Sequence, residues 1–165
     1  MNGYQYGKPL WSEILPGLWQ GGTHDTDTIK AASSSIYKPT RDDFDTVVTL
    51  YESANPVRGG VKEIRFGFYD GDMSDFNVAE DLFELVQTAH RDWKAGKRVL
   101  IRCQAGWNRS GLVMALTLIK DGLEPQEAID LIRDRRVPDA LSNRIFENWL
   151  LNEADLEFWR GKLAA

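Results

Sequence analysis

Short apolar runs separated by turn residues dominate the earlier part of the chain, a pattern that is typical of strands. Residues 13–22 are predicted to form two short extended pieces around a Pro-Gly turn, and the β-branched run at residues 45–50 a buried strand. Apolar residues alternate over residues 61–68, and an apolar run within residues 97–102 has the length of a buried strand. The pattern therefore predicts a sheet whose strands come early in the chain.

The helical period begins after residue 77. Asn77 is a favoured N-cap and is followed by Glu80, which together suggest a capping box, and the next apolar positions fall on one helical face until Gly96. Further helices are predicted over residues 110–121, over residues 125–137 and after a cap at Ser142. Early strands and late helices predict an α/β protein in which one sheet is faced by a helical cluster.

The length of 165 residues fits one domain with a sizeable core. We expect that domain to span residues 1–165, with its core at about residues 13–151. Residues 23–43 are polar and have no clear period, so they are predicted to form a loop with at most a short helix. Two roles stay open for this loop: a variable surface insertion, or a border of the functional site.

Composition and charge narrow the class of protein. Hydrophobic residues make up 42% and charged residues 27%, which is ordinary for a soluble globular domain. No apolar run reaches the roughly 18 residues of a membrane span, and the first residues lack the features of a signal peptide, so we expect no membrane segment and a cytoplasmic protein. The net charge of -5 argues against a protein that coats nucleic acid.

The cysteine and histidine counts bear on redox chemistry and metals. The chain has one cysteine, which cannot form an internal disulfide and therefore fits a reducing compartment. One cysteine and two histidines are too few soft ligands for a zinc site. We expect neither a metal nor a cofactor.

That cysteine, Cys103, lies between the predicted strand ending at residue 102 and the predicted helix beginning at Ser110, and Arg109 follows it by six residues. A thiol is an effective nucleophile only when it is ionised. Converging backbone N–H groups, the positive end of the helix and a nearby arginine would all stabilise a thiolate, and the same features bind a phosphate dianion. The pattern therefore predicts a phosphate-binding turn with a nucleophile at its base.

Individual residues of this turn suit that chemistry. Gly106 lets the backbone curl, Arg109 offers a planar fork for two phosphate oxygens, and Ser110 is placed to donate a hydrogen bond to the sulfur. The plain alternative is a small buried cysteine at the end of a strand. The joint occurrence of cysteine, arginine, serine and glycine in a strand–turn–helix context favours the catalytic interpretation.

Cys-x5-Arg-Ser between a strand and a helix resembles the signature of the protein tyrosine phosphatase superfamily, and the pattern around it resembles the compact dual-specificity branch. Residues 13–19, 76–78 and 143–146 also match, so the resemblance runs from about residue 13 to about residue 150. It implies a central mixed sheet of about four or five strands flanked by helices. It also implies a metal-independent phosphomonoesterase that acts on phosphotyrosine, and also on phosphoserine or phosphothreonine, in proteins.

The resemblance also implies roles for single residues. Cys103 would form a cysteinyl-phosphate, while Arg109 and the backbone amides of the turn would bind the phosphate oxygens. Those amides belong to Gln104, Ala105, Gly106, Trp107 and Asn108. An acid on a loop ahead of a helix would protonate the leaving oxygen. Asp72 lies 31 residues before Cys103 and is our first candidate, Asp70 is the second and Asp75 the third. The alternative is that all three only decorate a solvated turn.

Four further positions leave alternatives open. Arg102 stands where the family has histidine, and it would either point inward and add positive charge or point away and leave slower chemistry. Asn143 resembles a helix-borne asparagine that supports the loop, or is a plain helix-start residue. Arg136 belongs either to a solvated basic face or to a second anion site. Trp107 would either stack on an aromatic substrate or pack inward.

Other substrates and functions remain to be separated. The same chemistry on an RNA 5′-phosphate, a phosphoinositide or an inositol phosphate is the alternative, although the side chains inside the turn are neutral. A non-catalytic phospho-binding module would normally lack the cysteine or the arginine, and a redox protein would need a resolving cysteine. We expect phosphorylated proteins or peptides as partners, phosphate-like oxyanions in the turn, and a monomer.

Overall fold

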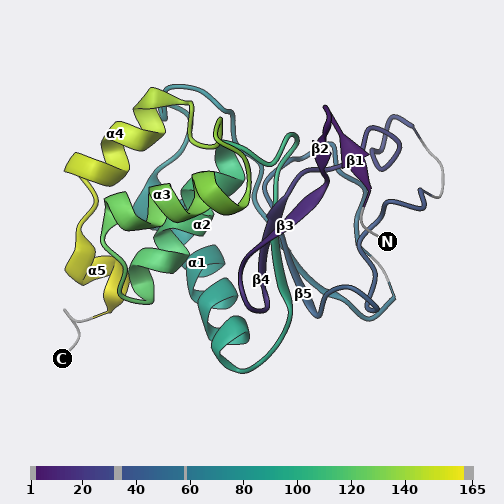
Figure 1. Cartoon of the computed structure of the whole chain (residues 1–165), viewed down its shortest axis with the longest axis horizontal. Helices are drawn as coiled ribbons and strands as arrows, with labels where there is room; N and C mark the ends of the chain where they lie inside the picture. The colour runs from purple at the N-terminus through teal and green to yellow at the C-terminus, as the bar shows by residue number, and fades with distance from the viewer. Residues whose placement is uncertain (1–2, 32–34, 58, 162–165) are drawn as a thin grey trace.

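The computed structural model describes residues 3–31, 35–57 and 59–161. Its main sheet has five strands in the order β3-β4-β7-β5-β6, in which β3 and β4 are antiparallel and all other neighbours are parallel (Figure 1). The strands are β3 (Trp11–Leu15), β4 (Leu18–Gly21), β5 (Thr46–Thr49), β6 (Lys62–Arg65) and β7 (Val99–Arg102). The mixed five-stranded sheet expected from the resemblance is therefore confirmed.

The helices gather on one side of the sheet, as Figure 1 shows. They are α1 (Val78–Lys94), α2 (Arg109–Lys120), α3 (Pro125–Arg135), α4 (Arg144–Asn152) and α5 (Leu156–Arg160). Helix α2 is buried from residue 110 to residue 119 and contacts α1, α3, α4 and α5. Because it is apolar all round, it occupies the centre of the helical layer and fixes the turn that precedes it.

The edge at which the parallel strands end determines where a site can form. Strands β4, β7, β5 and β6 run parallel to one another, so their carboxyl ends meet at one edge of the sheet. Ligands of open α/β sheets bind outside these carboxyl ends. Segments 22–27, 50–55, 66–75 and 103–109 all follow these strands and share that edge.

Several local predictions need correction. Asn143, and not Ser142, caps α4, because its Oδ1 accepts hydrogen bonds from the N–H groups of Ile145 and Phe146. At the start of α1, Asn77 Oδ1 accepts from Glu80 N as predicted, but Asn77 N donates to Asp81 Oδ2 at 2.8 Å and not to Glu80. Two short strands, β1 (Tyr4–Gln5) and β2 (Lys8–Pro9), and helix α5 were not predicted, since segments of two to five residues carry no periodic signal.

The predicted loop at residues 23–43 contains turns and no helix in its described residues, and residues 32–34 lie outside them. Its first part is not a free surface, since Thr23 and Asp27 are buried. A second small core lies nearby and is formed by Leu10, Trp11, Phe44, Val47 and Leu100. The loop therefore belongs partly to the folded body and reaches the edge where the parallel strands end.

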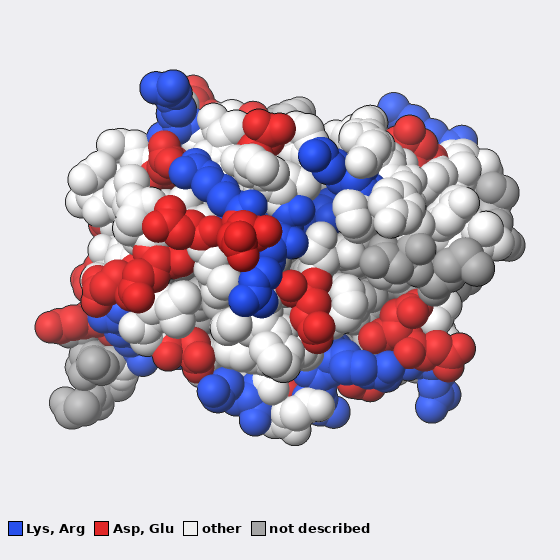
Figure 2. Space-filling view, viewed as in Figure 1, with Lys and Arg blue, Asp and Glu red and all other residues white. Residues whose placement is uncertain are grey.

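On the face shown in Figure 2, Lys and Arg are interspersed with Asp and Glu, so no continuous basic surface covers the described residues on this side. Among the described residues, no helix is both long enough and apolar enough to cross a membrane.

Candidate active site

Cys103 lies at the base of the turn of residues 103–109, which we call the Cys103 loop. Its side chain is buried, and its Sγ accepts a hydrogen bond of 3.3 Å from Gly106 N. Ser110 Oγ also lies 3.3 Å from Sγ. Gly106 has a φ of 81°, and a Cβ at this position would lie 2.5 Å from the carbonyl carbon of Gly21, so only glycine fits here.

Arg109 begins α2 and lines a cavity beside the Cys103 loop, which we call the mouth. Its Nη1 donates to Phe68 O at 3.2 Å, and its guanidinium carbon lies 5.5 Å from the centre of the Tyr51 ring. Arg109 Nε is buried and has no hydrogen-bond partner among the described residues. The mouth is a cavity of about 320 Å³ lined by Tyr51, Glu52, Phe68, Tyr69, Asp70, Gln104 and Arg109. A bound anion would supply the partner that Arg109 Nε lacks.

Asp70 is held at the mouth through both carboxylate oxygens. Asn108 Nδ2, from the Cys103 loop, donates to Asp70 Oδ2 at 2.9 Å, and Asn143 Nδ2, from the start of α4, donates to Asp70 Oδ1 at 2.7 Å. Asn143 Nδ2 also donates to Gly71 O, and Asn143 N donates to Asn108 Oδ1. These bonds tie the loop that carries Asp70 to the loop that carries the cysteine.

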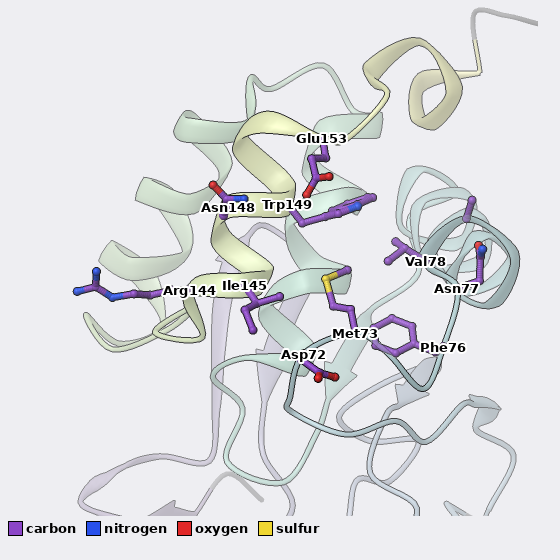
Figure 3. A pocket seen from close by; sticks show the side chains of 11 residues that line it. Asp72, Met73, Phe76, Asn77, Val78, Arg144, Ile145, Asn148, Trp149 and Glu153 are labelled. Carbon is purple, nitrogen blue, oxygen red and sulfur yellow. The ribbon is translucent and has the colours of Figure 1, made fainter.

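Asp72 lies elsewhere. Its Oδ1 accepts from Ser74 N at 3.0 Å, and hydrogen bonds from the Ser74 side chain and backbone lower the pKa of Asp72 below its usual range. Asp72 borders a different groove, of about 680 Å³, which Figure 3 shows between the loop before α1 and helix α4. The structure therefore brings Asp70, and not our first candidate Asp72, into contact with the Cys103 loop.

Asp75, the third acidic candidate, accepts a hydrogen bond from Tyr69 N at 3.3 Å and lines a small cavity beside the mouth. The other lining residues of that cavity are Glu52, Gly67, Phe68 and Tyr69. Asp75 makes no described contact with the Cys103 loop. Its carboxylate lies at the rim and serves the local turn.

Arg102 ends β7, and its side chain is buried among polar partners. Its guanidinium forms an ion pair of 3.2 Å with the buried Asp27 and also donates to Thr49 Oγ1 at 3.1 Å. Asn55 O accepts at 3.0 Å, and Glu63 Oε2 lies 3.5 Å away. Burial lowers the pKa of Arg102, while the charges of Asp27 and Glu63 oppose this effect. The Arg102 guanidinium therefore pairs with the Asp27 and Glu63 carboxylates. This agrees with the alternative in which Arg102 points away from the sulfur.

Arg136 is not a second substrate-anion site, because its side chain is buried behind the Cys103 loop. Only 6% of Arg136 is exposed, and burial lowers its pKa to about 10, although the charge of Cys103 acts in the opposite direction. Its Nε donates to Gly106 O at 3.1 Å and its Nη2 to Ala105 O at 3.2 Å. The sequence could not show this, since Arg136 lies some thirty positions from the carbonyls it binds.

Two further side chains of the Cys103 loop, those of Gln104 and Trp107, lie in different surroundings. Gln104 is exposed and lines the mouth, whereas Trp107 is partly buried and packs against the main core. Packing is therefore the role that the structure assigns to Trp107. Sequence reasoning missed Tyr51, Phe68 and Tyr69 at the mouth. Their one signal was their position at two predicted strands: Tyr51 and Tyr69 directly follow them, and Phe68 is the last residue of the second.

Comparisons with known proteins show which family the chain resembles. A family model described as the catalytic domain of dual specificity phosphatases matches residues 34–155. Protein tyrosine phosphatase type IVA 3 of Bos taurus is 31% identical over 86 residues, which are 52% of this chain and 49% of that protein. The chain thus spans about half the length of the curated relatives it matches.

Solved structures share the fold. A mouse putative dual specificity phosphatase, crystallised with zinc tungstate, superposes with a TM-score of 0.69 at 20% identity, over 98% of this chain and 92% of that one. Human DUSP28 superposes with a TM-score of 0.68 at 22% identity, over 95% and 97% of the two chains. The family model covers the Cys103 loop, Asp70 and Asn143 together. The chain belongs to the dual specificity phosphatase catalytic-domain family.

Proposed function

We propose that this protein hydrolyses phosphotyrosine, and also phosphoserine or phosphothreonine, in proteins through a cysteinyl-phosphate and without a metal ion. One observation carries the proposal: the Cys103 sulfur accepts a backbone N–H at the base of a loop whose arginine has an unpartnered, buried Nε among the described residues. Arg109 lines the mouth, so an anion that enters this cavity would meet the arginine, and the Cys103 loop adjoins the cavity through Gln104. This arrangement suits attack on phosphorus followed by charge stabilisation.

The reaction would proceed in two steps. The Cys103 thiolate attacks phosphorus, the P–O bond to the leaving group breaks, and Asp70 gives its proton to the departing oxygen. A water molecule then attacks the cysteinyl-phosphate and gives a proton to the Asp70 carboxylate, while the S–P bond breaks and inorganic phosphate forms. Arg109 and the loop amides hold the phosphate oxygens throughout, and Ser110 Oγ stabilises the returning thiolate.

Asp70 is assigned as the acid because of its contacts. Asn108 and Asn143 hold it at the loop that carries Cys103 and on the lining of the mouth. Asp72 instead accepts a hydrogen bond from Ser74 N within its own turn and lines a different groove. Spacing in the sequence favoured Asp72, and contact geometry outweighs spacing here.

The lining of the mouth favours a phosphorylated aromatic side chain. Tyr51, Phe68 and Tyr69 supply aromatic walls, and Arg109 is the one cation among the lining residues, which include the carboxylates of Glu52 and Asp70. A polyanion such as an RNA 5′-phosphate or an inositol phosphate would bring several charges to a rim with two carboxylates. A single phosphate on an apolar ring fits this lining better.

The test uses wild-type protein and Cys103→Ser in the presence of EDTA. Wild type should hydrolyse p-nitrophenyl phosphate at mildly acidic to neutral pH, and Cys103→Ser should lose about 10³-fold or more of that rate while it still binds inorganic phosphate. A panel of phosphotyrosyl, phosphoseryl and phosphothreonyl peptides, RNA 5′-phosphate and inositol phosphates then ranks the substrates. No turnover by the wild type, or turnover that requires a metal, would overturn the proposed reaction, and preference for RNA or inositol phosphates would overturn the substrate.

A further inference from the structure

Every backbone carbonyl from residue 103 to residue 107 accepts a hydrogen bond from outside the Cys103 loop. Thr23 provides the first two bonds: its Oγ1 donates to Cys103 O at 2.9 Å and its N–H donates to Gln104 O at 2.9 Å. The contact is close, since a Cβ on the neighbouring Gly22 would lie 2.6 Å from Gln104 O. The start of the polar loop at residues 23–43 therefore packs directly on the catalytic turn.

Three other residues occupy the remaining carbonyls. Arg136 bridges two of them, with Nη2 to Ala105 O at 3.2 Å and Nε to Gly106 O at 3.1 Å. Gln20 Nε2, from β4, also donates to Gly106 O at 3.1 Å, and Leu141 N donates to Trp107 O at 3.0 Å. The Arg136 side chain is also fixed by Pro9 and Ser12, because its Nη1 donates to Pro9 O and to Ser12 Oγ.

Because the peptide bond is planar, hydrogen bonds that fix the carbonyl groups of the Cys103 loop also fix the direction of its N–H groups. A trans peptide is planar, so its C=O and the N–H of the next residue point to opposite sides. Carbonyls 103–107 that are held outward therefore direct the N–H groups of residues 104–108 toward the inside of the loop. Gly106 N, which lies 3.3 Å from Cys103 Sγ, is the N–H that follows the carbonyl bound by Arg136 Nη2.

Burial makes these outer donors effective. Thr23 is 2% exposed and Gln20 is fully buried, so water does not compete for the carbonyls they bind. The positive charge of Arg136 lies on the carbonyl side of the same peptides and is attracted by Cys103. The other charged groups at the loop are Arg109, from α2, and Asp70, which reaches it through Asn108. Arg136 acts from behind the loop, whereas Arg109 and Asp70 act from the mouth.

We propose that Thr23 and Arg136 are positioning residues for the phosphatase reaction: they fix the carbonyl side of the Cys103 loop and so aim its amides at the sulfur and at the bound phosphate. This inference rests on the proposed function. It gives the loop at residues 23–43 a catalytic contact that its polar sequence did not reveal. It also gives Arg136 a role in oxyanion binding without any contact with substrate.

Thr23 allows a test with matched variants. Thr23→Val keeps the shape and removes the Oγ1 donor, whereas Thr23→Ser keeps the donor and removes a methyl group. We expect Thr23→Val to weaken inhibition by inorganic phosphate by about tenfold. It should also slow the alkylation of Cys103 by iodoacetamide at mildly acidic pH by about tenfold. These effects are smaller than the rate loss of about 10²-fold or more that follows removal of a direct oxyanion donor. Thr23→Ser should restore both values to within about twofold of the wild type.

Arg160 provides a control for Arg136, because it makes similar hydrogen bonds away from the Cys103 loop. Arg160 also bridges two carbonyls, with Nε to Ile119 O at 3.0 Å and Nη2 to Leu123 O at 2.8 Å, but these lie at the far end of α2. Arg136→Met should lower phosphate affinity and alkylation rate by more than Thr23→Val does, and Arg160→Met should change neither. Arg136→Lys keeps a charge but cannot bridge both carbonyls, so it should show a reduced loss in the same direction and serves if Arg136→Met does not fold.

The outcomes separate this inference from the proposed function. Inactivity of the wild type on every phosphate ester would overturn the function, whereas alkylation and phosphate binding would still report the loop geometry. Folded Thr23→Val and Arg136→Lys proteins with wild-type phosphate affinity and alkylation rates would overturn the inference, even in an active enzyme. Lower thermal stability with both of these values unchanged would also overturn it, because the contacts would then be structural only.

Discussion

Asp70 and Asp72 are two positions apart and have different surroundings. Asn108 and Asn143, which lie 38 and 73 positions away from Asp70, hold its carboxylate at the Cys103 loop, whereas Asp72 bonds to Ser74 within its own turn. Spacing from the cysteine favoured Asp72, because the sequence shows distance along the chain and not these long-range contacts. Cys103, Arg109 and Ser110 could be singled out from the sequence because their chemistry lies within one short turn.

Substitution of each aspartate distinguishes the two assignments. Asp70→Asn should lower kcat on a phosphotyrosyl peptide by about 10²-fold, because the departing oxygen loses its proton donor. The loss should be smaller on p-nitrophenyl phosphate, whose leaving group needs less protonation. Asp72→Asn serves as the matched control and should stay within a few fold of the wild type on both substrates. The assignment is wrong if Asp72→Asn shows the larger, leaving-group-dependent loss.

At the scale of elements, the pattern of apolar positions predicted most of the secondary structure. The Pro-Gly turn between β3 and β4, the β-branched strand β5, the strand β7 and helices α1 to α3 all agree with the sequence. The role of Arg102 could not be predicted, since its ion-pair partner Asp27 lies 75 positions away in a loop without a periodic signal. This buried pair joins the strand that leads to Cys103 to the loop that carries Thr23.

Arg102 should therefore matter more for stability than a surface arginine. Arg102→Met leaves the buried Asp27 without its cation, which should cost about 3–5 kcal/mol of unfolding free energy in urea denaturation. Arg98→Met is the control, because Arg98 and Asp45 form an exposed pair with 43% and 39% of their side chains accessible. That substitution should cost about 1 kcal/mol or less. Equal losses in the two variants would contradict the role of the buried pair.

At the scale of the whole molecule, strand order explains which part of the site the sequence could not specify. The phosphate-binding turn is local, whereas the mouth joins Tyr51 after β5, Asp70 after β6 and Arg109 after β7. These segments meet only because β4, β7, β5 and β6 lie side by side in parallel with their carboxyl ends at one edge. Neither that strand order nor the packing of Thr23 and Arg136 behind the turn is encoded in a short motif.

The proposed reaction requires that phosphate is transferred to the Cys103 sulfur, and a trapping experiment can detect this intermediate. Wild-type protein is mixed with a phosphotyrosyl peptide that carries a radiolabelled phosphate, quenched rapidly and mapped by proteolysis and mass spectrometry. We expect transient label on the peptide that contains Cys103 and no label on Cys103→Ser. Turnover without label at Cys103, label on another residue, or full activity of Cys103→Ser would contradict it.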